Sequence, residues 1–243
     1  MSVKFVTAGM LVLMLIQTAH AAIALDRTRV IFDGRHNSET MTITNQNKEL
    51  PYLAQSWVEN ESGEKISSPL IALPPLQRVE PGAKSQVKVQ TTRDVSRLSQ
   101  DKESLFYFNV REIPPKGKKP NTLQIALQTR VKMFYRPAAL ALNNGDIPQK
   151  ALTMSHEGNI YRLNNPTGYY ITIVKAGTSE DDTSLKNFKA LMIPPKGSVT
   201  LSDSPAELGN HPVLTYINDW GGRPKLIFSC NGSTCTVTDT RAG

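Results

Sequence analysis

The sequence predicts an all-β protein made of two immunoglobulin-like β-sandwich domains. Short runs in which apolar and polar residues alternate recur along the whole chain, and this period of two is the signature of strands. Turn-forming clusters of Ser, Thr and Asn, together with 16 Pro and 15 Gly, separate these runs. No long amphipathic helix pattern occurs, and 243 residues suffice for two domains of ordinary size.

The longest alternating run covers residues 121–137 and reads NTLQIALQTRVKMFYRP. A strand of this length would span roughly 45 Å at ~3.3 Å per residue, well beyond the usual length of about 5–6 residues. One interpretation is a long core strand. The other is that one half packs within its own domain, while the other half offers its edge and its apolar side chains to a second polypeptide. Residues 116–120, just before this run, carry charges and a proline. Such residues hinder the aggregation of exposed strand edges.

The N-terminus has the features of a secretory signal peptide. Lys4 precedes a mainly apolar run at 5–16, and Ala19-His20-Ala21 forms a small-x-small cleavage site. We expect residues 1–21 to be removed, which leaves 243 − 21 = 222 residues that begin at Ala22. The alternative, a transmembrane anchor, is disfavoured because the apolar run is too short to span a bilayer and a polar segment follows it.

Cys230 and Cys235 are expected to form a disulfide, because an exported chain meets oxidising surroundings. They flank a turn sequence at 231–234. A redox-active pair is the alternative, but such motifs have two intervening residues.

The net charge of +7 and the pI near 9.4 permit a nucleic acid, an acidic membrane surface or an acidic partner. Export argues against nucleic acid, and the basic residues form no stripe interleaved with aromatic residues. We therefore expect a generally basic, solvated surface with a few functional cations.

Residues 22–141 are assigned to the first sandwich. The apolar parity of the run 23–32 changes midway, which predicts a bulge or a switch between sheets near Arg27 and Arg29. The other strands expected in this domain lie at 40–45, 50–59, 85–90, 105–110 and 121–137.

Residues 142–243 are assigned to a second sandwich, which follows a linker rich in Pro, Asn and Gly. Its strands are expected at 160–164, 170–176, 188–193, 198–201, 213–218, 226–230 and 235–239. The pentapeptide Ile-Pro-Pro-Lys-Gly occurs at 113–117 and again at 193–197, in different strand contexts. We interpret it as a reused turn and not as a duplication.

The chain offers little for catalysis. After signal removal, His36, His156 and His211 remain, and none has the spacing of metal ligands. Nucleophile elbows, phosphate loops and dinucleotide fingerprints are lacking from the sequence. We expect no enzymatic activity, no cofactor and no metal.

Several motifs, taken together, resemble the PapD-type periplasmic chaperones of pilus assembly. They are LDRTR at 25–29, LPYLAQ at 50–55, ESLFYFN at 103–109, FYRP at 134–137 and YIND at 216–219. The likeness covers essentially all of the mature chain and departs at Ser99, a turn position where the family usually has proline, alanine or asparagine. It implies two immunoglobulin-like domains set as a boomerang with a cleft between them. It also implies a periplasmic chaperone that binds, folds and caps pilus subunits and delivers them to the outer-membrane usher.

The resemblance also implies roles for individual residues. The chaperone lends part of its long strand to a subunit that lacks its last strand, and chaperone–pilin pairs are a known example of strand addition. Leu123, Ile125 and Leu127 would enter the subunit's groove. Arg29 and Lys132 would bind the subunit's terminal carboxylate. The charged trio that bridges the domains would be Glu103, Arg136 and Asp219.

The loop before the long strand is short, and no cysteines flank it. This is similar to the branch of the family that builds rod-like pili. The free protein could also pair with itself through the same edge, as a self-capping homodimer.

Two other functions were considered. A pilin or adhesin component would carry a strand-donating extension at its N-terminus, but Leu25 follows the cleavage site too closely for one. A secreted enzyme or carbohydrate-binding sandwich would need a cluster of polar and aromatic residues, and no such cluster is evident in the sequence.

Overall fold

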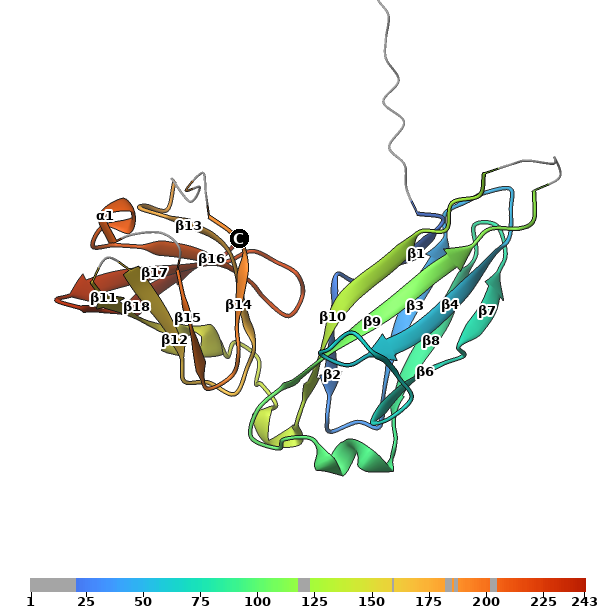
Figure 1. Cartoon of the computed structure of the whole chain (residues 1–243), viewed down its shortest axis with the longest axis horizontal. Coiled ribbons are helices and arrows are strands. Elements are labelled where there is room, and N and C mark those ends of the chain that lie inside the picture. Colours follow the sequence, from blue (N-terminus) through green and yellow to red (C-terminus); the bar gives the residue numbers. More distant parts are fainter. Residues whose placement is uncertain (1–20, 118–122, 159, 182–184, 186–187, 202–204) are drawn as a thin grey trace, which may run out of the picture.

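The computed structural model describes residues 21–117, 123–158, 160–181, 185, 188–201 and 205–243. Two β-rich domains meet at the linker and diverge from it like the arms of a boomerang (Figure 1). The predicted fold class, two immunoglobulin-like sandwiches, is confirmed.

The first domain is a sandwich of two sheets around one core. One sheet has the order β1 (Ile23–Leu25), β3 (Ser38–Asn45), β8 (Lys84–Thr91) and β6 (Leu70–Leu73). The other has the order β2 (Arg29–Asp33), β10 (Gln128–Arg136), β9 (Ser104–Ile113), β4 (Tyr52–Glu59) and β5 (Lys65–Ile66), with β7 (Leu76–Val79) also paired to β4. A 3₁₀ helix, η1 (Arg93–Arg97), follows β8. The strands β6 and β7, which lie on either side of Pro74 and Pro75, were not predicted from the sequence.

The first run of the chain changes sheets as predicted. Its first part, β1, pairs antiparallel with β3, and its second part, β2, pairs parallel with β10 in the opposite sheet. Asp26–Thr28 bridges the two, so the change of parity in the sequence marks the point where the strand crosses between sheets.

The strand predicted over 121–137 is shorter in the structure. It begins at Gln128, and residues 123–127 before it belong to no strand. Leu123, Ile125 and Leu127 are 85 %, 65 % and 40 % exposed, whereas Met133 is fully buried. The prediction was wrong for 123–127 because the neighbouring strand β9 ends at Ile113 and holds this segment at its end, where the backbone nitrogen of Glu112 donates to the carbonyl of Leu127. Residues 121 and 122 lie outside the described residues.

The second domain is one sheet that curves around its own core. The order is β14 (Leu191–Ile193), β13 (Ile171–Gly177), β16 (Val213–Ile217), β17 (Lys225–Asn231), β18 (Thr234–Arg241), β11 (Thr153–Glu157), β12 (Ile160–Asn165) and β15 (Gly197–Thr200). Short helical turns complete it: η3 (Pro148–Ala151) and α1 (Pro205–Leu208). A further turn, η2 (Ala138–Leu140), lies between the last strand of the first domain and the linker. The strand β11 was not predicted, although its Met154 and the preceding Leu152 alternate with polar residues.

The predicted disulfide between Cys230 and Cys235 is confirmed. The two residues lie opposite each other on β17 and β18, across a tight turn, with Cα atoms 3.9 Å apart. The bridge therefore fastens one hairpin of the second domain and leaves the first domain free of crosslinks.

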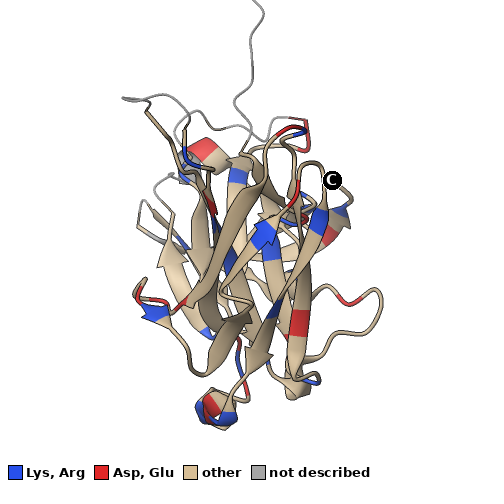
Figure 2. Ribbon diagram, turned by 90° about the vertical axis from the view of Figure 1, so that its right-hand side faces the viewer, with Lys and Arg blue, Asp and Glu red and all other residues tan. Residues whose placement is uncertain are grey.

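The surface charges are dispersed. In the domain that faces the viewer in Figure 2, Lys and Arg are spread over several strands, with Asp and Glu among them. Of the helices that the structure describes, none combines the length and the apolar character that a membrane crossing would need.

Candidate functional site

Arg29 and Lys132 lie side by side where β2 first meets β10. They face each other across the first step of the parallel ladder, so the two cations stand at the point where β2 begins to cover the edge of β10. Burial lowers the pKa of Lys132, and the neighbouring charge of Arg29 lowers it further. The pKa of Arg29 is also lowered by burial, although the negative charges of Asp219 and Glu103 oppose this shift.

Arg29 contacts both domains. Its Nη1 donates a hydrogen bond to the carbonyl oxygen of Ile217 in the second domain at 3.2 Å. Its guanidinium carbon lies 5.9 Å from the centre of the Phe134 ring, and that ring lies 5.5 Å from Tyr170 of the second domain. The Nε atom of Arg29 is buried and has no partner among the described residues. The domain interface therefore holds the side chain of Arg29 in place.

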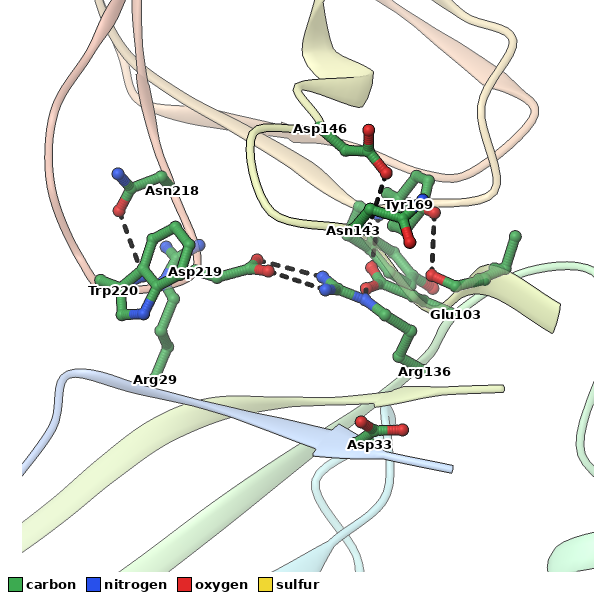
Figure 3. Close-up of polar contacts among 12 residues, drawn as sticks. Arg29, Asp33, Glu103, Arg136, Asn143, Asp146, Tyr169, Asn218, Asp219 and Trp220 are labelled. Atoms are coloured by element: carbon green, nitrogen blue, oxygen red, sulfur yellow. Dashed lines mark hydrogen bonds and ion pairs between the residues drawn. The ribbon is translucent and has the colours of Figure 1, made fainter. Parts of the chain in front are cut away.

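Glu103, Arg136 and Asp219 form a continuous charged bridge between the domains (Figure 3). Nε of Arg136 donates to Oε1 of Glu103 at 2.8 Å, and its two terminal nitrogens donate to the two oxygens of Asp219 at 2.7 and 3.0 Å. Such bidentate, charge-assisted pairs are among the strong hydrogen bonds in proteins, and they also fix the relative orientation of the two groups. Burial raises the pKa of Glu103, with Arg136 opposing that shift. For Arg136, burial alone would lower the pKa, but the hydrogen bonds and charges of both carboxylates outweigh it and raise the pKa.

The same bridge is bound to the backbone of the second domain. Oε2 of Glu103 accepts a hydrogen bond from the backbone nitrogen of Tyr170, and the backbone nitrogen of Glu103 donates to the carbonyl of Gly168, both at 2.8 Å. A Cβ atom on Gly168 would approach the carbonyl oxygen of Asp101 to 2.9 Å, so a glycine allows the close contact here. The YIND motif and the ESLFYFN motif gave no indication of this backbone pairing.

A second ion pair crosses the interface between Asp101 and Lys196. It holds the pKa of Asp101 near about 2, with a smaller contribution from Ser99. Lys196 belongs to the second copy of Ile-Pro-Pro-Lys-Gly, which the sequence analysis had interpreted as a turn alone. The pentapeptide at 113–117 has no such role: its Lys116 forms no ion pair among the described residues.

A pocket of about 660 Å³ lies between the domains, beside the charged bridge. Its walls include Ile31 of the first domain, Tyr216 and Trp220 of the second, and the linker. Arg29 and Lys132 do not line it, so the pocket and the pair of cations are separate features. Within the described part of the chain, His, Cys, Asp and Glu form no group that could hold a metal ion.

The geometry thus offers a half-covered sheet edge, a pair of cations at the end of that edge, and a domain interface that fixes one of them. Family models match most of the chain: the PapD N-terminal domain of pili and flagellar-assembly chaperones at residues 22–141, and the C-terminal domain of the pili assembly chaperone PapD at 148–228. The chain belongs to the PapD family of pilus-assembly chaperones.

Relatives of this chaperone match it over nearly the full length of both chains. The chaperone protein PapD of Escherichia coli is 52 % identical over 226 residues, which is 93 % of both chains. The chaperone protein PmfD of Proteus mirabilis is 45 % identical over 94 % of this chain and 91 % of its own.

Solved structures agree with the fold. The periplasmic chaperone SfaE matches with a TM-score of 0.65 and 27 % identity, over 91 % of this chain and 98 % of its own. A complex of the Salmonella enterica SafA pilin with the SafB chaperone matches with a TM-score of 0.70 and 23 % identity, over 88 % of this chain and 98 % of that chain.

Proposed function

We propose that this chaperone captures pilus subunits by lending them residues 123–127 as the strand they lack. The observation that carries the proposal is the exposure of Leu123, Ile125 and Leu127, three large apolar side chains at alternate positions. Burying one such side chain is worth about 1.5–3 kcal/mol, so three could contribute roughly 5–9 kcal/mol before ordering costs.

The open edge of β10 supports the same function. In the described structure β9 pairs with β10 from Gln128 onward, whereas β2 covers it only from Lys132 onward. Residues 128–131 therefore have one free side, and residues 123–127 continue it. A guest strand added here would gain backbone hydrogen bonds along the edge, and its pockets for alternate side chains would provide specificity.

The pair of cations determines which way the guest would run. A guest strand on the free part of β10 would occupy the position of β2 in the sheet and end where Arg29 begins. If it runs parallel to β10, its C-terminal carboxylate arrives between Arg29 and Lys132 and receives charge-assisted hydrogen bonds. If it runs antiparallel, its N-terminal side meets two positive charges. We therefore infer a parallel guest whose carboxylate sets the register.

The charged bridge has a supporting role in this proposal. Glu103, Arg136 and Asp219 hold the two domains together, and Arg29 donates to the backbone just before Asp219. The bridge thereby keeps the anchoring cation directed toward the guest.

The remaining parts of the function follow from the family. We propose that residues 1–21 direct export, that the protein acts in the periplasm on pilins and adhesin, and that it delivers them to the outer-membrane usher. We propose a binding protein and not an enzyme. The same open edge would allow two free molecules to cap each other as a homodimer.

Replacement of Lys132 tests the proposal. Lys132→Ala should abolish co-purification of subunits from a periplasmic extract while the circular dichroism spectrum stays that of the wild type, because the carboxylate loses its anchor and the core is untouched. The matched control is Lys88→Ala on β8, an exposed lysine of the other sheet, which should capture subunits normally. Capture by Lys132→Ala at the wild-type yield would overturn the proposal.

A further inference from the structure

Glu112 on β9 is a buried carboxylate that subunit capture does not use. Its side chain is 5 % exposed and points to the inner side of the sheet, as do Phe108 and Val110. Its Oε2 accepts a hydrogen bond from the backbone nitrogen of Ile23 at 3.0 Å, and among the described residues no basic side chain pairs with it. A buried carboxylate that lacks a counter-charge typically costs several kcal/mol.

Ala22 directly precedes Ile23, the residue whose backbone nitrogen binds this carboxylate. Its carbonyl oxygen accepts a hydrogen bond from the backbone nitrogen of Gln46 at 2.7 Å, and the next nitrogen, that of Ile23, is bound to Glu112. The nitrogen of Ala22 is three covalent bonds from that of Ile23, which limits their separation to less than about 4 Å. The chain thus places the nitrogen of Ala22 close to an acid that has no cation.

We propose that the α-ammonium group of Ala22, created by removal of the signal peptide, is the counter-ion of Glu112. This inference rests on the cleavage site proposed above. Hydrolysis of the peptide bond between Ala21 and Ala22 adds one water, leaving a carboxylate on Ala21 and an ammonium on Ala22. Before cleavage the same nitrogen is a neutral amide, so the charge of Glu112 is balanced only in the processed chain. An α-amine has an ordinary pKa of about 7.7–8.0 and is mostly protonated at neutral pH.

The ion pair would act at the base of the exposed segment. The backbone nitrogen of Glu112 donates to the carbonyl of Leu127 at 3.0 Å, so the residue that holds the start of β1 also holds the end of residues 123–127. Since β1 belongs to one sheet and β9 to the other, the pair would fasten the two sheets together where the open edge begins. Processing would then stabilise the part of the domain that receives the guest.

Blocking the amine tests this directly. We would compare chains that begin at Ala22 with a free or an acetylated amine, each with Glu112 or with Glu112→Gln, by denaturant unfolding. All carry Trp220→Phe, so that Trp57 on β4 reports only on the first domain. Acetylation should lower the folded-to-unfolded ratio about tenfold when Glu112 is present, which is ~1.4 kcal/mol, and less than about twofold in Glu112→Gln. The exposed Glu49→Gln is the control and should keep the full effect of acetylation.

An equal loss in both backgrounds, or none in either, would overturn the proposal. Hydrogen exchange provides a readout that needs no substitution at Glu112: acetylation should speed exchange of the Glu112 amide, and unchanged exchange would contradict the proposal. No subunit enters these measurements, so they are independent of capture. If N-terminal sequencing of the exported protein found a start other than Ala22, this inference would fail while the proposal for residues 123–127 stood.

Discussion

The two halves of the run 121–137 share one pattern and have opposite environments. From Lys132 to Arg136 the side chains are buried or half-buried, with β9 on one side of the strand and β2 on the other. Phe134 and Arg136 also contact the second domain. At 123–127 the apolar side chains are exposed and belong to no strand. Alternation therefore encodes the ability to form a half-buried strand, and the neighbours decide whether that ability is used within the chain or kept for a partner.

Met133→Asp should have the largest effect. Met133 is fully buried, so the substitution places an unpaired charge in the core and should cost more than about 4–5 kcal/mol, enough to unfold the first domain. Loss of the cooperative unfolding transition, followed by Trp57 fluorescence, is the measurement. A folded variant with near wild-type stability would show that this half of the run is not the packed half.

Arg136→Ala should come next. Removing the cation leaves Glu103 buried without a partner, which typically costs about 3–5 kcal/mol. The control lies on the same strand: Arg130 pairs with Glu59 at the surface, and Arg130→Ala should cost at most about 1 kcal/mol. Adding Glu103→Gln to Arg136→Ala should recover part of the stability, because it removes the buried carboxylate charge that has lost its partner. If denaturant unfolding showed the same loss of stability for Arg136→Ala and Arg130→Ala, the expected difference between the buried and the exposed ion pair would be contradicted.

Ile125→Asp should leave stability within about 0.5 kcal/mol of the wild type, because the side chain is exposed in the free protein. It should nonetheless abolish subunit capture, because the charge would enter the subunit's groove. Gln124→Asp, of opposite parity on the same segment, should still capture subunits. Pull-down of subunits with both variants decides the matter, and unaffected capture by Ile125→Asp would count against strand donation.

The smallest effect is expected at the exposed ion pair between Asp101 and Lys196. Because the pKa of Asp101 in the folded protein lies near about 2, below its ordinary 3.8, the stabilisation is present above pH 3.8 and is lost as the pH falls through about 2. Lys196→Met should raise the pKa of Asp101 toward 3.8 in an NMR titration. Ser99→Ala should raise it less. A titration of Asp101 that Lys196→Met leaves unchanged would exclude the ion pair.

Much of the fold was predictable from local pattern. The parity change between Ile23 and Phe32 predicted a bulge or a switch of sheets, and the switch is what the structure has. The signal-like N-terminus implied oxidising surroundings and so predicted the disulfide between Cys230 and Cys235. Both predictions needed only short segments of sequence and no knowledge of contacts between distant segments. The strand β11 was missed although the alternation of Leu152 and Met154 was available.

Contacts between distant segments could not be predicted in this way. The pairing of Glu103 with Gly168 and Tyr170 depends on how two separately folded domains meet, and no periodicity records that. The hydrogen bond from Ile23 to Glu112 links residues 89 positions apart. The roles of Arg29, Lys132 and residues 123–127 in capture came from the family resemblance and remain predictions.

The crossing at Asp26–Thr28 has a consequence for how such a protein can diversify. Arg29 is the first residue of β2, and β2 begins where the open edge of β10 ends. If a guest strand binds as proposed, a single bend therefore determines both the length of β10 available to it and the location of Arg29, the cation proposed to bind its carboxylate. Moving the bend by two residues would shift both by the same step, so the free length of β10 and the position of Arg29 would change together.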